Sequence, residues 1–296
     1  MAIPESQLET WSHQGSITQS SETYGVIKRA LEASNTPYYG KNFLVFLQGS
    51  YGNDTNIYSE SDVDVVIRLD SVFFHDLSEM PQEQQSAFIA AHTDSIYKYD
   101  NFKSEVLTTL NTNFGQSVKA GTRAIKISAN GNRRNADVLI ATEYRRYHKF
   151  ISLSDQEYDL GICFFTSTGT KIANYPKQHS ENCTIKHQAT NTWFKPAVRI
   201  LKNMRGKLVE NGEISNDIAP SYFLEGLLYN VPNDKFGKSY SDTLVACLNW
   251  IFEADRTKFV CANFQYYLLG DSNVSWPEAN CNKFLNEVKK LWKEWS

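Results

Sequence analysis

The stretch LQGSYGNDTNIYSESDVDVVI occupies residues 47–67 and holds the residues on which the expected fold and chemistry depend most. It begins at the end of FLVFL (43–47), a short apolar run typical of a buried strand, and a Gly-Ser pair then breaks this run. After a polar loop, DVDVVIRL (62–69) alternates carboxylates with valines, as a strand does when one face is wet and the other packed. The side chains of Asp62 and Asp64 should therefore point the same way.

A third carboxylate follows on another predicted strand. Residues 124–147 have apolar runs on both sides of an Asn-Gly pair, which is a strong signal for a β-hairpin, and the second run carries Asp137. Two carboxylates at i and i+2 on one strand, with a third on a neighbouring strand, can bridge two divalent cations about 3.5–4 Å apart. Such a site suits phosphoryl transfer, and a Gly-Ser turn can offer phosphates its backbone N–H groups and a hydroxyl.

Taken alone, the Asp-x-Asp pattern has an ordinary explanation, because the solvated face of an edge strand shows the same alternation. The combination with the Gly-Ser turn and the third acid favours a metal site. Three carboxylates brought together on one sheet repel one another, and a bound cation compensates for that repulsion. We therefore expect Asp62, Asp64 and Asp137 to be the catalytic and metal-binding residues.

The remaining sequence divides into a mixed first part and a helical second part. Residues 15–34 and 82–114 have helical patterns, and 161–176 has the pattern of another hairpin. After this hairpin, the segments show the i, i+3, i+4 apolar spacing of amphipathic helices. The sequence thus predicts an α+β fold, with a mixed, twisted sheet and flanking helices in a core at 1–187 and a helical C-terminal lobe at 188–296. A cleft between these two parts is the expected ligand site.

Composition and charge exclude several classes of protein. The chain has 296 residues, of which 41% are hydrophobic and 21% charged, and this suits a globular protein with a sizeable core. No window approaches the twenty apolar residues of a membrane helix, and the first residues lack a secretory pattern, so a cytoplasmic protein is expected. A net charge of −3 gives no support for binding duplex nucleic acid through a large basic surface. The five cysteines are too widely spaced for a paired metal motif, and we expect buried thiols.

At residues 47–67 the sequence resembles the G-S…D-x-D signature of the DNA polymerase β-like nucleotidyltransferases, and specifically their CD-NTase branch, the bacterial relatives of cyclic GMP-AMP synthase. The segment NADVLIA (135–141) fits the strand that carries the third aspartate of the family. Three further segments are similar to clade E, which contains the cyclic UMP-AMP synthases of anti-phage CBASS systems: NYPKQH (174–179), FKPAVRILKNMR (194–205) and PSYFLEGLLYNVP (220–232). The resemblance is specific because these separate segments agree in order.

The resemblance implies a role for each matching residue. Asp62 and Asp64 would hold both metal ions, and Asp137 would complete the site and help to activate the attacking 3′-hydroxyl. The implied metal is Mg²⁺, with Mn²⁺ as a substitute. Ser50 would contact the donor triphosphate, and Gln48 would face the nucleotide in the cleft. The residues implied for nucleotide binding are Gln48, Gly49, Ser50, Asn174, Lys202, Ser221 and Tyr222.

Lys202 and Ser221 match the lysine and serine with which the family grips the β- and γ-phosphates, and Tyr222 matches the tyrosine that stacks on the donor base. These roles are chemically sound, because lysine is a point-charge ligand for phosphate and a tyrosine ring is a platform for a base. The residue types also allow another explanation, in which Lys202 is a solvated helix residue and Tyr222 a core aromatic.

Asn174 lies in the loop before Pro176, at a place where the resemblance implies a residue that reads the base. Its amide can both donate to and accept from the edge of uracil. An asparagine that merely forms a turn explains the position equally well.

His179, Cys183 and His187 recur at every fourth position and could present three zinc ligands on one helical face. A fourth ligand and the close cysteine pairs of structural zinc sites are missing from this part of the sequence. Metal binding by these three residues is therefore not expected.

The resulting expectation is a Mg²⁺-dependent nucleotidyltransferase that condenses nucleoside triphosphates, UTP and ATP among them, into a cyclic dinucleotide. The product would contain uridine, as cyclic UMP-AMP or cyclic di-UMP. The resemblance implies anti-phage signalling through an effector that the product switches on, and we expect a monomer. Two alternatives are a template-independent nucleotidyltransferase acting on RNA or protein, and a catalytically silent nucleotide-binding module. The low net charge weighs against the RNA version of the first, and the three intact acids weigh against the second.

Overall fold

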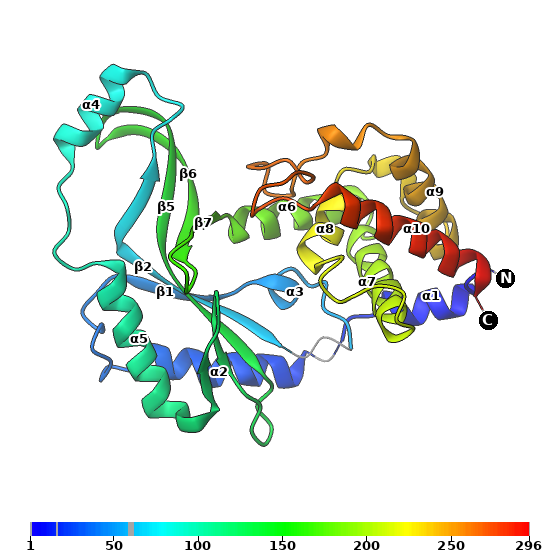
Figure 1. The fold of residues 1–296 in the computed structure, drawn as a ribbon, viewed down its shortest axis with the longest axis horizontal. Helices are drawn as coiled ribbons and strands as arrows, with labels where there is room; N and C mark the ends of the chain where they lie inside the picture. The colour runs from blue at the N-terminus through cyan, green and yellow to red at the C-terminus, as the bar shows by residue number, and fades with distance from the viewer. Residues whose placement is uncertain (1, 16, 59–61, 296) are drawn as a thin grey trace. The chain divides into compact units, whose positions relative to one another are not determined.

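The computed structural model describes residues 2–15, 17–58 and 62–295, and the chain forms two compact units (Figure 1). Each unit combines segments that are far apart in the sequence. We call them the sheet unit, residues 18–48 and 62–175, and the helical unit, residues 1–17, 49–61 and 176–296. The expected domain boundary after residue 187 stays a prediction. The loop that follows the first strand, residues 49–61, groups with the helical unit although the strands on both sides of it belong to the sheet unit.

Seven strands form one mixed sheet among the described residues of the sheet unit. The strands are β1 (Phe43–Leu47), β2 (Val63–Asp76), β3 (Val118–Ala120), β4 (Ile125–Ile127), β5 (Ala136–Ser152), β6 (Asp155–Phe165) and β7 (Lys171–Asn174). Their order is β1-β2-β5-β4-β3, and β5 also pairs with β6, which pairs with β7. The strands β2 and β5 are parallel, and the other pairs are antiparallel. The expected mixed sheet is confirmed.

The first two strands show where the hydrophobic pattern predicts burial and where it does not. β1 covers the apolar run 43–47 from end to end, but of its five residues just Val45 is fully buried, because β1 is an edge strand rather than the buried strand expected. In β2 the alternation of wet and dry positions holds at the start, where Val63 and Val65 are buried and Asp64 between them is only partly buried. Both faces are covered from Val66 to Leu69, because β2 is a central strand of the sheet.

Three α-helices accompany the sheet: α2 (Thr18–Leu31), α4 (Gln82–Ala91) and α5 (Tyr99–Phe114). In Figure 1, α2 and α5 lie together along the sheet, and they pack against each other and against β2. The helical region expected at 82–114 is thus two helices separated by residues 92–98. The second helix has its own start signal, since the Asn101 side chain accepts a hydrogen bond from the Lys98 backbone N–H at 2.9 Å.

The two predicted hairpins are confirmed, and a third was missed. β4 and β5 are antiparallel around the Asn-Gly turn, in which Gly131 has the left-handed φ of 58°. β6 and β7 form the second hairpin. The missed hairpin joins β5 to β6 between Ser152 and Asp155, in a polar stretch whose strands are stabilised by pairing rather than by a clear hydrophobic pattern.

The helical unit is built around α7. Its α-helices are α1 (Glu5–Ser12), α3 (Gly49–Gly52), α6 (Pro176–Ala189), α7 (Phe194–Glu210), α8 (Ser221–Tyr229), α9 (Tyr240–Glu253) and α10 (Glu278–Glu294). Short 3₁₀ turns occur at η1 (Gly115–Ser117) in the sheet unit and at η2 (Asn233–Lys235) and η3 (Arg256–Lys258) in this one. α7 contacts α1, α6, α8, α9 and α10, so its apolar side chains form the centre of one core. A helical C-terminal part, as expected, is confirmed.

Several smaller features of the helical unit complete the comparison with the sequence. The short polar helix α1 was not expected, and α6 begins twelve residues before the predicted start of helical structure at residue 188. All five cysteines are buried and free, as predicted. Within the described ranges, each helix is too short or too polar to cross a bilayer.

Candidate active site

The acidic residues lie at the start of two neighbouring parallel strands. Asp64 of β2 and Asp137 of β5 are register partners, so their side chains point to the same face of the sheet. Asp62 precedes β2 by one residue and is exposed. The backbone N–H of Gln48, just after β1, donates to the Asp64 carbonyl at 3.0 Å. These four residues therefore share one end of the sheet unit.

Burial and the neighbouring charges at this end of the sheet change the pKa of Asp137. Burial raises the pKa of its carboxyl group, Lys126 opposite it on β4 lowers it, and the charge of Asp62 raises it again. The net direction is upward. The folded chain thus holds Asp137 in a partly buried place where a second carboxylate disfavours its ionised form.

These side chains fit a hard divalent cation. Mg²⁺ prefers carboxylate oxygens, and a positive ion here would offset the charge that disfavours ionised Asp137. Among the described residues, the ligand oxygens of Asp62, Asp64 and Asp137 do not all lie within 4.8 Å of one another. Mg²⁺ is commonly bound through one or two carboxylates and completes its coordination with substrate phosphates and water.

Gly49 and Ser50 begin a tight loop in the helical unit. Gly49 has a φ of 64°, a left-handed value that glycine adopts without steric cost. The N–H of Asn53 donates to the Gly49 carbonyl at 3.0 Å, and the N–H of Thr55 donates to the Ser50 carbonyl at 2.9 Å. We call residues 49–55 the Gly-Ser loop. These backbone bonds fix the conformation of the loop that carries Ser50.

Lys202 is fully buried in α7 and contacts the Gly-Ser loop. Its Nζ donates to the Ser50 hydroxyl oxygen at 2.7 Å and to the Thr55 carbonyl at 2.8 Å. The alternative that Lys202 is an ordinary solvated helix residue is therefore wrong. An ammonium group held against a serine hydroxyl provides a positive charge and a donor at one point, which is the chemistry that a phosphate requires.

Ser221 and Tyr222 are the first two residues of α8. The Ser221 hydroxyl oxygen accepts from Arg205 Nη1 at 3.2 Å, and Arg205 also donates to the Ala219 carbonyl at 3.0 Å. The Tyr222 ring stacks on the His179 ring with 4.5 Å between the centroids, and burial raises the pKa of its hydroxyl. Tyr222 packs against the core, as the alternative explanation for it expected, and it remains partly exposed. Its stacking on a donor base stays a prediction.

Asn174 is the last residue of β7 in the sheet unit. Its Oδ1 accepts from the backbone N–H of Tyr175 at 2.8 Å, as a turn-forming asparagine can. The strand passes close to its neighbour here, since a Cβ at Gly161 would lie 2.6 Å from the Asn174 carbonyl oxygen. A base that pairs with this amide must use Nδ2 or displace the local bond to Oδ1.

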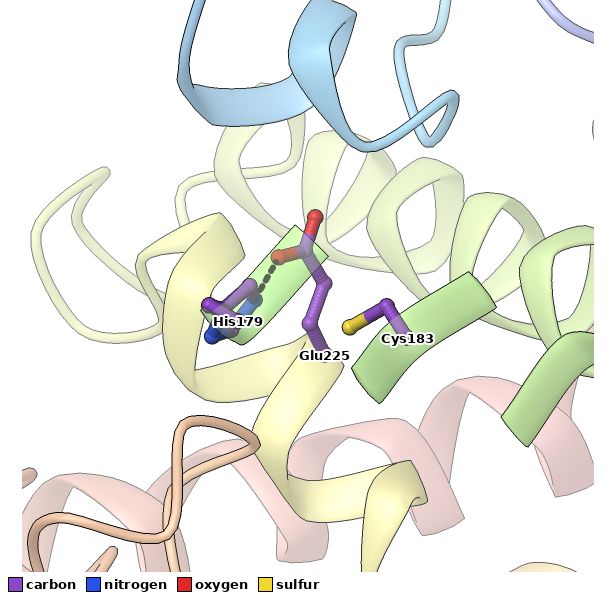
Figure 2. Close-up of side chains that lie close together, drawn as sticks. All are labelled: His179, Cys183 and Glu225. Carbon is purple, nitrogen blue, oxygen red and sulfur yellow. Dashed lines mark hydrogen bonds and ion pairs between the residues drawn. The ribbon is translucent and has the colours of Figure 1, made fainter. Parts of the chain in front are cut away.

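His179, Cys183 and Glu225 form a buried cluster in the helical unit (Figure 2). One ligand-type atom from each lies within 4.8 Å of the others. The first two residues come from α6 and Glu225 from α8, and His179 Nε2 lies 2.6 Å from Glu225 Oε2. His187, the third residue of the expected series, instead accepts from the backbone N–H of Lys195 at 3.3 Å. The one advance signal for Glu225 was a lone acid in the apolar helix FLEGLLY.

Burial and charge affect the two acidic side chains of this cluster in opposite directions. Burial and the charge of Glu225 raise the pKa of the Cys183 thiol well above its ordinary value. Burial also opposes ionisation of Glu225, but the hydrogen bond and charge of His179 and the charge of Lys202 lower its pKa overall. The Glu225 carboxylate also accepts a hydrogen bond from Asn53 Nδ2 at 2.9 Å, so the cluster is part of a larger hydrogen-bonded network.

Comparisons with known proteins agree with this arrangement of residues. Residues 181–293 match the family model of the cGAS/DncV-like nucleotidyltransferase C-terminal helical domain. The chain is 41% identical to a cyclic UMP-AMP synthase of Rhodothermus marinus, over 100% of this chain and 99% of the relative. It is 36% identical to the cyclic nucleotide synthase CdnE01 of Staphylococcus haemolyticus, over the whole of both chains.

A solved structure and a further relative extend the comparison. The structure of the Rhodothermus marinus CdnE c-UMP-AMP synthase with Apcpp and Upnpp superposes with a TM-score of 0.89 at 40% identity, covering 99% of this chain and 98% of that one. A relative from Legionella pneumophila is a cyclic dipyrimidine nucleotide synthase, 32% identical over 95% of each chain. The named products thus differ among relatives that match this chain over nearly their full length.

Proposed function

The chain belongs to the cGAS/DncV-like nucleotidyltransferase family, in the CdnE clade of cyclic nucleotide synthases, and from this membership we propose that it joins UTP and ATP into cyclic UMP-AMP. The observation that carries the proposal is the direct register of Asp64 and Asp137 in a chain similar over its full length to a cyclic UMP-AMP synthase. Cyclic di-UMP is the second candidate product, because a dipyrimidine synthase is among the relatives.

We assign the metal site to Asp62, Asp64 and Asp137. Mg²⁺, or Mn²⁺ in its place, would lower the pKa of the attacking 3′-hydroxyl and neutralise charge on the triphosphate when bound. Asp64 and Asp137 are register partners, so their carboxylates would hold the metal and the attacking hydroxyl on one face of the sheet. Asp137 has a raised pKa and is the acid we propose to help activate the hydroxyl.

We assign the triphosphate to the Gly-Ser loop, Lys202 and Ser221. Ser50 and Lys202 are already joined at 2.7 Å, so the hydroxyl and the ammonium group meet a phosphate together. Ser221 is held by Arg205, whose charge adds to the attraction for an anion.

We assign the nucleoside to Tyr222, Gln48 and Asn174. The Tyr222 ring is supported by the His179 ring and would stack on the donor base. Gln48 is beside Asp64 and would face the nucleotide. Asn174 would help to select uracil through its amide. The expected setting is the cytoplasm, where a monomer draws on cellular nucleotides and its product switches on a separate effector of anti-phage defence.

The test is incubation with all four labelled nucleoside triphosphates and Mg²⁺, followed by phosphatase treatment and mass spectrometry. We expect a phosphatase-resistant product that contains one uridine and one adenosine. The Asp62→Asn, Asp64→Asn double variant is the control, since it should give none. Resistant product without uridine would contradict the proposed bases, and extension of RNA or protein without cyclic product would contradict the proposed reaction.

A further inference from the structure

Glu225 is a fully buried acid outside the residues assigned to nucleotide, and its bonds lead to the Gly-Ser loop. Its carboxylate accepts from His179 Nε2 at 2.6 Å, from Asn53 Nδ2 at 2.9 Å and from the Thr55 hydroxyl in a short hydrogen bond. A buried carboxylate is costly unless several donors compensate it. Two of these three donors are residues of the Gly-Ser loop, so this charge is tied to the loop's conformation.

Thr55 connects Glu225 to both proposed phosphate ligands. Its hydroxyl donates to the carboxylate, its backbone N–H donates to the Ser50 carbonyl at 2.9 Å, and its own carbonyl accepts from Lys202 Nζ at 2.8 Å. Lys202 in turn donates to the Ser50 hydroxyl. A shift of Thr55 would therefore move both the serine and the lysine.

Asn53 connects Glu225 to Gly49, the first residue of the Gly-Ser loop. Asn53 donates its side-chain amide to Glu225 and its backbone N–H to the Gly49 carbonyl. Asp54 between Asn53 and Thr55 has a φ of 56° and bonds Lys195 Nζ at 2.9 Å. An aspartate in this left-handed conformation requires surrounding contacts that fix it. The bonds of Glu225 to the residues on both sides provide them.

His179 connects the same carboxylate to the proposed base platform. Its Nε2 bonds Glu225, and its ring stacks on Tyr222 with an interplanar angle of 23°. The Tyr222 hydroxyl accepts from Asn263 Nδ2 at 2.9 Å, which fixes the far end of the ring. One imidazole therefore contacts both the carboxylate that holds the Gly-Ser loop and the ring assigned to the base.

We propose that Glu225, held by His179, is a positioning residue for the donor nucleotide. It fixes the Gly-Ser loop for the triphosphate and, through His179, orients Tyr222 for the base. This inference rests on the proposed nucleotide-binding roles of Ser50, Lys202 and Tyr222. It assigns the buried cluster of Figure 2 to substrate positioning.

Two variants of matched shape test the connection. Glu225→Gln keeps the volume and removes the charge that complements Lys202, and Thr55→Val removes only the hydroxyl that ties the loop to the carboxylate. Each should raise the Kd of a nonhydrolysable UTP analogue, and the KM for NTP, by roughly tenfold with a much smaller change in kcat. Inorganic tripolyphosphate should lose affinity in parallel, because the loop contacts phosphate.

The control is Thr243→Val in α9 of the same unit. The Thr243 hydroxyl is also buried, and it donates to the Gly237 carbonyl at 2.8 Å. This variant loses a hydroxyl of the same kind, so it should lower stability without raising the Kd of the analogue. His179→Phe keeps a ring against Tyr222 but loses the bond to Glu225, and it should weaken analogue binding as well.

The outcomes separate the two proposals. If Glu225→Gln and Thr55→Val bind the analogue and tripolyphosphate as wild type does, or weaken only as much as Thr243→Val, then Glu225 has no positioning role. Should Glu225→Gln fail to fold, Thr55→Val and His179→Phe decide the question by the same measurements. A wild-type protein that binds the analogue but makes no cyclic product contradicts the proposed function and leaves the positioning test intact.

Discussion

Replacing Asp137 by asparagine should stabilise the metal-free protein while it abolishes synthesis. Burial raises the pKa of this carboxyl group, Lys126 opposes the rise, and Asp62 adds to it. Because the ionised form is disfavoured in the folded state, the free energy of unfolding falls as the pH rises from the ordinary pKa of 3.8 through the raised one. At neutral pH the whole loss is present, and asparagine removes it.

The expected gain is small but measurable. Interactions between partly exposed charges are worth about 0.2–1 kcal/mol, and Asp137→Asn removes one such repulsion from Asp62, so the gain should lie in this range. The entropy of unfolding is about 2.1 cal/mol/K per residue, so in a chain of this size such a gain raises the Tm by at most about 2 °C. Synthesis should fall below detection, because the change removes one of the three carboxylates assigned to the metal and the 3′-hydroxyl.

The assay is thermal unfolding in EDTA from about pH 4 to about pH 8, with product formation measured separately in Mg²⁺. The difference between the variant and wild type should grow with pH and then level off above the raised pKa. Lys126→Met is the matched control with the opposite sign, because Lys126 lowers the pKa of Asp137. The reasoning is refuted if Asp137→Asn is less stable than wild type at neutral pH, or if Lys126→Met is more stable.

Three further predictions concern the remaining residues of the proposed site. The Asp62→Asn, Asp64→Asn variant should keep or gain stability without metal and give no product, and substantial turnover in a mass-spectrometric assay would contradict the metal assignment. Replacing Lys202 or Ser221 by alanine should mainly raise the KM for NTP. The Lys202 variant should also lose stability, because it removes a buried ammonium group bonded to Ser50. A loss of kcat at unchanged KM would contradict both roles. Asn174→Ser should reduce uridine incorporation by about tenfold or more when mixed NTPs compete, because the lost hydrogen bonds in a desolvated pocket are worth about 1–3 kcal/mol. An unchanged product spectrum would leave Asn174 as a turn residue.

Local patterns in the sequence predicted much of the fold. The run 43–47 is β1, and the amphipathic helices expected in the C-terminal part include α7, because apolar periodicity and flanking turns act over a few residues. The Asn130-Gly131 pair was also sufficient to predict the hairpin between β4 and β5. Local patterns did not predict the hairpin around residues 152–155. Its residues are polar, and the two strands are stabilised by pairing β5 with β6 rather than by a hydrophobic pattern.

The sequence by itself determined which residue types could form the proposed site: a Gly-Ser turn, an Asp-x-Asp strand and a third aspartate on a second strand. Only the tertiary structure decided that Asp64 and Asp137 are register partners, because strand register depends on contacts between distant segments. It also decided that Lys202 is buried against Ser50, 152 residues away, and that Glu225 holds Asn53 across 172 residues. A buried charge takes its partners from whatever the fold brings near, and the residues beside it in the sequence do not specify them.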